Sequence, residues 1–337
     1  MAVSVIMTNT ASAFDLAFVG HYTQDTVVRP QETYTTQGGA FYYGCHVARR
    51  MGLQTAVVTR LARADFAVVE ELAALGVTVF ATPTPESTCL RLVYPTANLD
   101  QRTIYATGFA GPFTVAEVAP IQARTFHIGA SMRGEVPLAV VQALAAKGAR
   151  LSLDAQGFVR VQRDSTLVYA PWLEAGQVLS LVDVLKVDAV EAEFLTGHSE
   201  LREAAQALAA RGPREVVLTH GQGVLVLADG RCYQAPFVAQ EVRGRTGRGD
   251  TCITAYLGKR LTAPPGEAAV WAAALTSLKL AAPGPFRRDI AEVIDHVREE
   301  FAKFNQIVEK QRRKQIQVLE QELRELKFHA FRPPDES

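Results

Sequence analysis

Short apolar segments alternate with helical segments along most of this chain, and this alternation limits the folds open to it. The apolar segments are rich in Val, Leu and Ile and mostly lack polar alternation, as expected of strands buried on both faces of a parallel sheet. They lie at 15–20, 55–61, 77–82, 125–130, 150–155, 180–187 and 215–220. The helical segments at 40–52, 64–76, 137–148 and 200–212 each end in Gly, the usual C-terminal stop. The pattern predicts a doubly wound α/β domain with its ligand site at the carboxyl ends of the strands.

The composition fits a globular enzyme without a general attraction to polyanions. Of 337 residues, 48% are hydrophobic and 21% are charged, which argues against a disordered or fibrous protein. The 35 Lys and Arg residues balance 35 Asp and Glu residues, so nucleic acid and anionic lipid are disfavoured as partners. No uninterrupted apolar run reaches the length of a membrane span. We therefore expect neither nucleic acid nor membrane as a partner.

The cysteines favour a reducing compartment. They are widely scattered and form no CxxC pair, so they indicate neither a zinc site nor a disulfide framework. The four are Cys45, Cys89, Cys232 and Cys252. Reduced thiols in the cytoplasm are the expectation.

Two regions depart from the alternation of strand and helix. Residues 26–37 and 87–108 are predicted to be extended strands joined by polar turns. Such an insertion commonly forms a small β lid or an interface, although a plain edge hairpin fits the pattern equally well. We place both regions in a catalytic domain that covers residues 1–300.

The last segment, 301–337, is strongly charged and is predicted to be a separate amphipathic C-terminal helix and tail. Its apolar residues recur at helical spacing, but two sets are out of phase as heptads, so a regular coiled coil is not expected. Two roles stay open: a dimerisation arm that makes a homodimer, or a helix folded back on its own domain.

A glycine-rich turn precedes a helix at 244–261, where the sequence is GRTGRGDTCITAYLGKRL. Free N–H groups and the positive end of the helix dipole make such a place suitable for an anion. It matches neither a Walker motif, which needs Gly-Lys-Ser/Thr, nor a dinucleotide fingerprint after the first strand. The carboxylate of Asp250 then needs an explanation, and the plain one is that it is the N-cap of the helix.

Two motifs together resemble the ribokinase, or PfkB-type, carbohydrate kinase family. TGRGDTCITAYL, which contains Asp250, is similar to the late Gly-x-Gly-Asp signature of that family, and GGAFYYGCHVARRMG at 38–52 is similar to its early glycine-pair signature. The order and wide separation of the two make them more specific than either alone. The resemblance covers about 14–300 and implies a three-layer α/β/α sandwich with a mainly parallel central sheet and a small β lid. It also implies ATP and Mg²⁺ as cofactors.

Weaker similarities carry over further site residues. Asp25 stands where the family has its substrate-binding aspartate, and LKVDAVEAEFLTG resembles the Asn-x-x-Glu segment, with Asp188 in place of Asn and Glu191 retained. The resemblance implies that the nucleotide site includes Thr219, Gly221 and Ser277, the last from a helix that flanks the adenine. Departures from the family pattern are Arg248, Cys252 and Tyr43. Tyr43 either stacks on the acceptor ring or packs its helix against the sheet.

The resemblance implies these roles in phosphoryl transfer to an alcohol. Asp250 is the general base, and the N–H groups of Gly247, Arg248 and Gly249 form the anion hole. Mg²⁺ is held mostly through water, with Glu191 and Asp188 as acids around it.

The acceptor site is predicted to contain Asp25, Gly38, Gly39 and Tyr43. We therefore expect an ATP-dependent kinase that acts on a hydroxyl of a small sugar or cyclic polyol. DAQGFVR at 154–160 resembles inositol-kinase-like members and tilts the expectation toward a cyclic polyol. The alternatives are a nucleoside kinase and a catalytically silent relative that binds ligand.

Overall fold

The computed structural model describes residues 14–96, 101–239 and 241–299. The chain divides into two compact units, Met1–Ile290 and Ala291–Ser337. In the second unit, 291–299 is helical. The tail predicted at 301–337 lies outside the described residues. Among the helices of the described part, none is long and apolar enough to cross a membrane.

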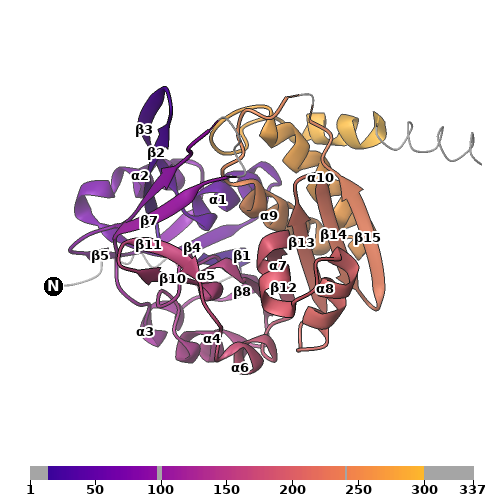
Figure 1. Ribbon diagram of the computed structural model, residues 1–337, viewed down its shortest axis with the longest axis horizontal. Coiled ribbons are helices and arrows are strands. Elements are labelled where there is room, and N and C mark those ends of the chain that lie inside the picture. Colours follow the sequence, from indigo (N-terminus) through magenta and orange to yellow (C-terminus); the bar gives the residue numbers. More distant parts are fainter. Residues whose placement is uncertain (1–13, 97–100, 240, 300–337) are drawn as a thin grey trace, which may run out of the picture. The chain divides into compact units, whose positions relative to one another are not determined.

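A nine-stranded sheet forms the centre of the first unit, in the order β15-β14-β13-β12-β9-β8-β1-β4-β5 (Figure 1). Its strands are β1 (Phe14–Val19), β4 (Thr55–Ala62), β5 (Thr78–Thr84), β8 (Ala123–Ile128), β9 (Arg150–Asp154), β12 (Val184–Asp188), β13 (Glu215–His220), β14 (Gly223–Ala228) and β15 (Arg231–Pro236). Pairing is parallel from β5 to β13, and β14 is antiparallel to both neighbours. The sheet is therefore mainly parallel, as predicted.

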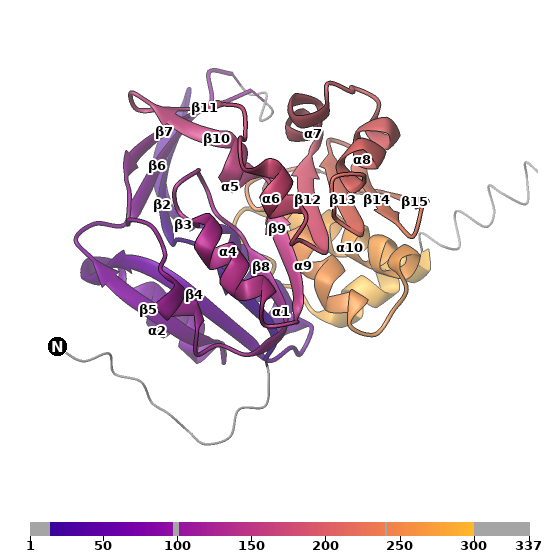
Figure 2. The same cartoon turned by 90° about the horizontal axis from the view of Figure 1, so that it is seen from below.

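Helices cover both faces of this sheet (Figure 2). They are α1 (Ala40–Arg50), α2 (Ala67–Ala74), α3 (Val115–Val118), α4 (Leu138–Ala145), α5 (Gln156–Val159), α6 (Ala175–Leu179), α7 (Ala189–Thr196), α8 (Leu201–Ala209), α9 (Arg248–Arg260) and α10 (Pro265–Leu280).

Strand β1 shows how the two faces are filled. Ala17 and Val19 belong to a core cluster that also holds residues of α4 and α8, whereas Phe18 points to α1 on the other face. A Cβ at Gly44 of α1 would lie 2.5 Å from Phe18 Cε1, so only glycine allows this close approach. Apolar residues on both sides of β1 explain why the strand segments lack alternation.

A second sheet of six strands stands beside the first, in the order β10-β11-β7-β6-β2-β3. It contains β2 (Thr23–Arg29), β3 (Glu32–Gly38), β6 (Thr88–Val93) and β7 (Thr103–Gly108), from the two regions that departed from the alternation. It also contains β10 (Arg160–Arg163) and β11 (Thr166–Tyr169), which the sequence analysis did not identify. The chain crosses between the sheets just after β1, so the second sheet begins at the carboxyl edge of the first (Figure 2).

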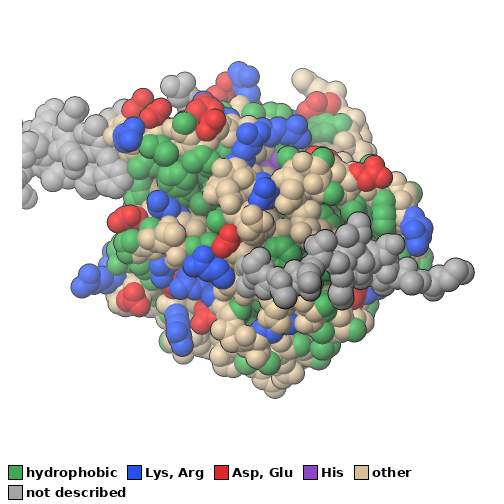
Figure 3. Space-filling model, turned by 180° about the vertical axis from the view of Figure 1, so that it is seen from behind, with side chains coloured by type: hydrophobic (Ala, Val, Ile, Leu, Met, Phe, Trp, Pro, Cys, Tyr) green, Lys and Arg blue, Asp and Glu red, His purple; other side chains and the backbone are tan. Residues whose placement is uncertain are grey.

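The surface agrees with the balanced composition. On the face in Figure 3, basic and acidic side chains are mixed among apolar ones.

The layers, the mainly parallel sheet and the small second sheet confirm the predicted α/β/α fold class.

Candidate active site

A cleft lies where the second sheet meets the carboxyl ends of β9, β12 and β13. Its lining includes Asp25, Leu90, Leu92 and Ile104 from the second sheet. Thr219 and the start of α9 complete the opposite side. The cleft contains most of the predicted site residues, namely Asp25, Gly39, Tyr43, Asp188, Thr219, Gly247, Arg248, Gly249 and Asp250.

The glycine turn leads directly into α9, as the sequence indicated. Gly247 is the N-cap of α9 with φ of 76°, and no side chain caps the helix. The first N–H groups of a helix have no intrahelical partner, so this uncapped start can bind an anion. The N–H of Arg248, one of the three predicted donors, bonds to the Arg245 carbonyl at 3.1 Å. Gly249 and Asp250 are the next residues of the first turn.

Tyr43 fixes the conformation of this turn. A Cβ at Gly247 would lie 2.2 Å from Cδ1 of Tyr43, so the ring lies directly against the turn. The ring is 3% exposed, and Lys279 Nζ lies 5.6 Å from its centroid. Tyr43 therefore packs against the turn and also lines the cleft.

Asp250 is the third residue of α9 and not its cap, so the N-cap alternative does not describe its position. Burial, reinforced by the nearby negative charge of Asp154, raises the pKa of Asp250 to about 6. Lys186, Lys279 and Arg160 oppose this rise. A carboxyl with such a pKa is mostly ionised at neutral pH and can still accept a proton.

Lys186 and Asp154 are site residues that the sequence analysis did not assign. Lys186 Nζ and Asp154 Oδ2 form an ion pair at 2.9 Å, and their side chains are 5% and 1% exposed. A Cβ at Gly249 would lie 3.0 Å from Lys186 Nζ, which places this ammonium group against the glycine turn. The signal was available in the sequence, because a charged residue inside an apolar strand such as VLKVD at 184–188 needs a partner.

Asp188 and Glu191 form a capping box at the start of α7. Asp188 Oδ1 accepts from the Glu191 N–H and Glu191 Oε2 accepts from the Asp188 N–H, both at 2.8 Å. The other oxygen of Glu191 accepts from Arg160 Nη2 at 3.0 Å. Both Glu191 oxygens thus have partners and the residue is fully buried, whereas Asp188 lines the cleft.

This geometry bears on the expected Mg²⁺. Asp188 has one carboxylate oxygen outside the capping box and faces the cleft, so it fits an ion held through water or donor phosphates. Glu191 fits better as the residue that holds Asp188 and Arg160 in place. Among the described residues, no three His, Cys, Asp or Glu side chains form a metal-ligand group.

Asp25 stands at the base of the second sheet, in β2. It is 5% exposed, and its Oδ1 atom has no hydrogen-bond partner within the described part of the chain. Burial raises its pKa to about 6, with Asp250 contributing to the rise and Thr23 and Arg102 opposing it. A buried, unpartnered carboxylate oxygen that faces a cleft is suited to accept a hydrogen bond from a ligand hydroxyl.

The glycine pair before α1 makes this position possible. A Cβ at Gly38 would lie 2.6 Å from Asp25 Oδ2, and one at Gly39 would lie 2.5 Å from the His21 carbonyl oxygen. Gly39 is the N-cap of α1 with φ of 97°, which favours glycine.

Two predicted residues of the nucleotide site do not line the cleft. Ser277 is buried in α10, where its hydroxyl donates to the Ala273 carbonyl at 2.7 Å and accepts from the Val238 N–H at 2.8 Å. Gly221 lies in the β13–β14 turn, and a Cβ there would meet no atom within 4 Å.

Comparisons with known proteins identify the family of the chain. The sequence profile of the pfkB family carbohydrate kinases matches residues 3–285. The chain therefore belongs to the PfkB family and is a carbohydrate kinase. None of the curated proteins compared matches the chain.

Similar solved structures are kinases of the same fold. One is a pyrophosphate-dependent kinase of the ribokinase family in a sulfate complex, with 35% identity and a TM-score of 0.78, where the match covers 83% of this chain and 99% of that one. A second, with 35% identity, a TM-score of 0.77 and coverages of 83% and 99%, is a pyrophosphate-dependent kinase of that family complexed with a pyrophosphate analog and myo-inositol. Arabidopsis thaliana ribokinase with ribose and ATP shares the fold at 20% identity, with a TM-score of 0.68 and coverages of 85% and 99%.

Proposed function

We propose that the enzyme phosphorylates a hydroxyl of a cyclic polyol of the myo-inositol class and that its phosphoryl donor is pyrophosphate. The observation that carries the donor assignment is the set of cations at the glycine turn. Lys186, Arg245 and Arg248 all line the cleft beside the start of α9. The similar kinases with 35% identity, described as pyrophosphate-dependent, support the same assignment.

The choice between pyrophosphate and a nucleotide as donor depends on electrostatics. A nucleotide gains affinity from its base and ribose, but pyrophosphate offers only phosphate oxygens, so its site has to supply more charged and N–H donors. Arg248 stands where the family usually has a small residue and thus adds a cation at the turn. Ser277, predicted beside the adenine, is instead held in hydrogen bonds within the protein. ATP with Mg²⁺ is the alternative donor.

The two sides of the cleft differ in polarity, which favours a cyclic polyol as the acceptor. Asp25 and Asp250 offer carboxylate oxygens to hydroxyl groups, while Leu90, Leu92 and Ile104 provide an apolar surface from the second sheet. A cyclic polyol has hydroxyls at its edge and C–H groups on its ring faces, so it can satisfy both sides at once.

The chemistry follows from this placement. The Asp250 carboxylate takes the proton of the acceptor hydroxyl as its oxygen attacks phosphorus. The bond from that phosphorus to the bridging oxygen of pyrophosphate breaks, and inorganic phosphate leaves. The Lys186 ammonium and the N–H groups at the start of α9 bind the oxygens of the transferred group. The N–H of Arg248 is not among them, because it bonds to the Arg245 carbonyl. Mg²⁺, when bound, neutralises charge on the donor, and Asp188 is the carboxylate placed to orient it.

A donor and acceptor matrix tests the proposal. The purified protein is incubated with Mg²⁺, a panel of inositols, sugars and nucleosides, and either pyrophosphate or ATP, and products are identified by phosphorus NMR. We expect an inositol monophosphate with pyrophosphate and at least about tenfold lower kcat/KM with ATP. Transfer only from ATP would overturn the donor assignment, and transfer to nucleosides but not polyols would overturn the acceptor assignment.

Arg248→Ala tests whether the Arg248 side chain binds the donor. Loss of its charge should raise the KM for pyrophosphate about tenfold or more and leave the KM for the acceptor nearly unchanged. Arg163→Ala, at an exposed position of β10, is the control.

A further inference from the structure

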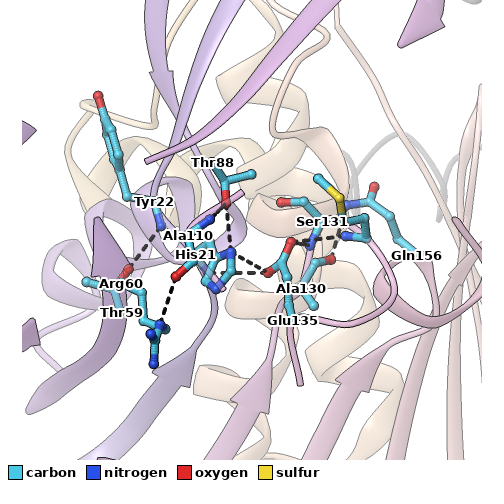
Figure 4. A network of polar contacts seen from close by, with 11 residues as sticks. His21, Tyr22, Thr59, Arg60, Thr88, Ala110, Ala130, Ser131, Glu135 and Gln156 are labelled. Atoms are coloured by element: carbon cyan, nitrogen blue, oxygen red, sulfur yellow. Dashed lines mark hydrogen bonds and ion pairs between the residues drawn. The ribbon is translucent and has the colours of Figure 1, made fainter. Parts of the chain in front are cut away.

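A buried polar cluster that the proposed chemistry does not use lies at the carboxyl end of β1 (Figure 4). Its centre is formed by His21, Thr88 and Glu135, each 0% exposed. His21 follows β1, Thr88 begins β6 of the second sheet, and Glu135 lies in the loop between β8 and α4. The cluster therefore joins three segments that are far apart in the sequence.

On one side, the cluster binds the start of β6 and the end of β7, which we call the stem of the second sheet. His21 Nδ1 is hydrogen-bonded to Thr88 Oγ1 at 2.8 Å, and Thr88 Oγ1 accepts from the Ala110 N–H at 3.1 Å. Ala110 follows β7, and its carbonyl also accepts from Arg60 Nε at 3.0 Å. Thr88 thus ties the start of β6 and the end of β7 to one histidine on the central sheet.

The other side of the cluster holds a wall of the cleft. Glu135 Oε1 accepts from the Ser131 N–H at 2.8 Å and from the Met132 N–H at 3.1 Å. Its second oxygen accepts from the His21 N–H at 3.5 Å and lies 3.6 Å from His21 Nδ1. Ser131 lines the cleft, so Glu135 connects His21 to a wall of the cleft.

Burial determines the protonation state of His21 and excludes bulk water from the cluster. Removal from water lowers the pKa of His21 to about 3 and raises the pKa of Glu135 to about 7, so the imidazole is neutral. Because all three side chains are buried, bulk water does not replace a hydrogen bond that breaks within the cluster. The contacts of His21 with Thr88 and with Glu135 thus form a continuous path from the start of β6 to the N–H groups of Ser131 and Met132.

We propose that His21, Thr88 and Glu135 are positioning residues that couple the second sheet to Ser131, so that the sheet and the acceptor side of the cleft move together. The kinetic role rests on the proposed function, since it concerns binding of the acceptor. None of the three lines the cleft, and each acts through the segments that it holds.

Hydrogen exchange in the absence of substrate tests the coupling itself. Thr88→Val keeps the shape of the side chain but removes the hydroxyl. We expect faster amide exchange at 108–111 and also at 129–136, across the His21–Glu135 contact. Thr107→Val is the matched control, because the exposed Thr107 of β7 donates only to the Cys89 carbonyl, at 3.3 Å. Faster exchange at 108–111 with unchanged exchange at 129–136 would overturn the proposal.

A substitution of Glu135, at the other end of the cluster, tests the coupling even if the Thr88 variant does not fold. Glu135→Gln keeps the size of the side chain but removes an oxygen acceptor. Because coupling between two sites is reciprocal, exchange should now rise at 108–111 although the change is at the loop. A Glu135→Gln variant with faster exchange only at 129–136 contradicts the coupling.

Steady-state kinetics then test the consequence of the coupling for acceptor binding. Thr88→Val should raise the acceptor KM about tenfold, leave the donor KM within about twofold, and increase donor hydrolysis relative to transfer, while Thr88→Ser restores all three. Equal effects on both KM values, or no rescue by Ser, would overturn a positioning role. If the wild-type enzyme transfers no phosphoryl group to any polyol, the proposed function fails, and the exchange experiment still decides the coupling.

Discussion

At the scale of single residues, the site depends on carboxyl groups whose pKa values are raised toward neutral pH by burial. Asp250 and Asp25 both line the cleft and both have a pKa raised to about 6 by burial, and the negative charge of Asp250 adds to the rise at Asp25. If Asp250 is the base, it must be ionised. We predict that log kcat/KM falls below about pH 6 with a slope between one and two, measured as a pH–rate profile.

Asp154→Asn should move this acid limb to lower pH. The negative charge of Asp154 raises the pKa of Asp250, so its removal lowers that pKa. Asn retains an oxygen for the N–H of Gln156, which bonds to Asp154 Oδ1 at 3.0 Å. Asp183→Asn is the control, because Asp183 also accepts a backbone N–H, from Leu151 at 2.9 Å, but lies at the amino end of the sheet. An unchanged limb in Asp154→Asn would contradict the assignment of the limb to Asp250.

Asp250 should also reduce stability at neutral pH. Its pKa is higher in the folded protein than the ordinary value of 3.8, so the folded state binds the proton more tightly and stability falls as pH rises from about 4 to about 6. Asp250→Asn should therefore be more stable than wild type by about 1–3 kcal/mol at pH 7, and the gain should vanish below about pH 4. Denaturant unfolding at both pH values measures the difference, and a less stable variant at pH 7 would refute it.

At the scale of elements, the turn before α9 is held by its fit to Tyr43. Gly247→Ala would need a Cβ 2.2 Å from the ring and a φ of 76°. We predict a loss of stability of about 1–3 kcal/mol and weaker donor binding, measured by thermal unfolding with and without pyrophosphate. Gly176→Ala in α6, where a Cβ meets no atom within 4 Å, should do neither. Normal donor binding in Gly247→Ala would separate the turn from the donor site.

The sequence predicted these elements unevenly, for physical reasons. Strand and helix segments were recognisable because burial on both faces imposes apolar runs, and the turn because it needs glycine beside a helix start. The β10–β11 pair was missed because four-residue strands carry too little pattern. Lys186, Asp154 and Arg160 were missed because their partners are distant in the sequence: Lys186 pairs with Asp154, and Arg160 pairs with Glu191. The apolar strand around Lys186 indicated that a partner was needed, but not which residue it is.

At the scale of the whole molecule, the described residues that line the cleft all lie in the first unit, between residues 23 and 250. Truncation after Glu300 should therefore leave kcat and both KM values within about twofold of the full chain. Light scattering of both forms shows whether 301–337 sets the oligomeric state. A truncated protein that folds and keeps its oligomeric state but loses transfer would place part of the site beyond residue 300.

Whether Asp250 is the general base is tested most directly by single-turnover transfer with Asp250→Asn, together with donor binding by calorimetry. Asn keeps the size of the side chain but cannot take the proton of the acceptor. Transfer should slow by about two to four orders of magnitude, while donor affinity and folding are retained. Transfer at nearly the wild-type rate would contradict the account, because Asp250 would then not be the base.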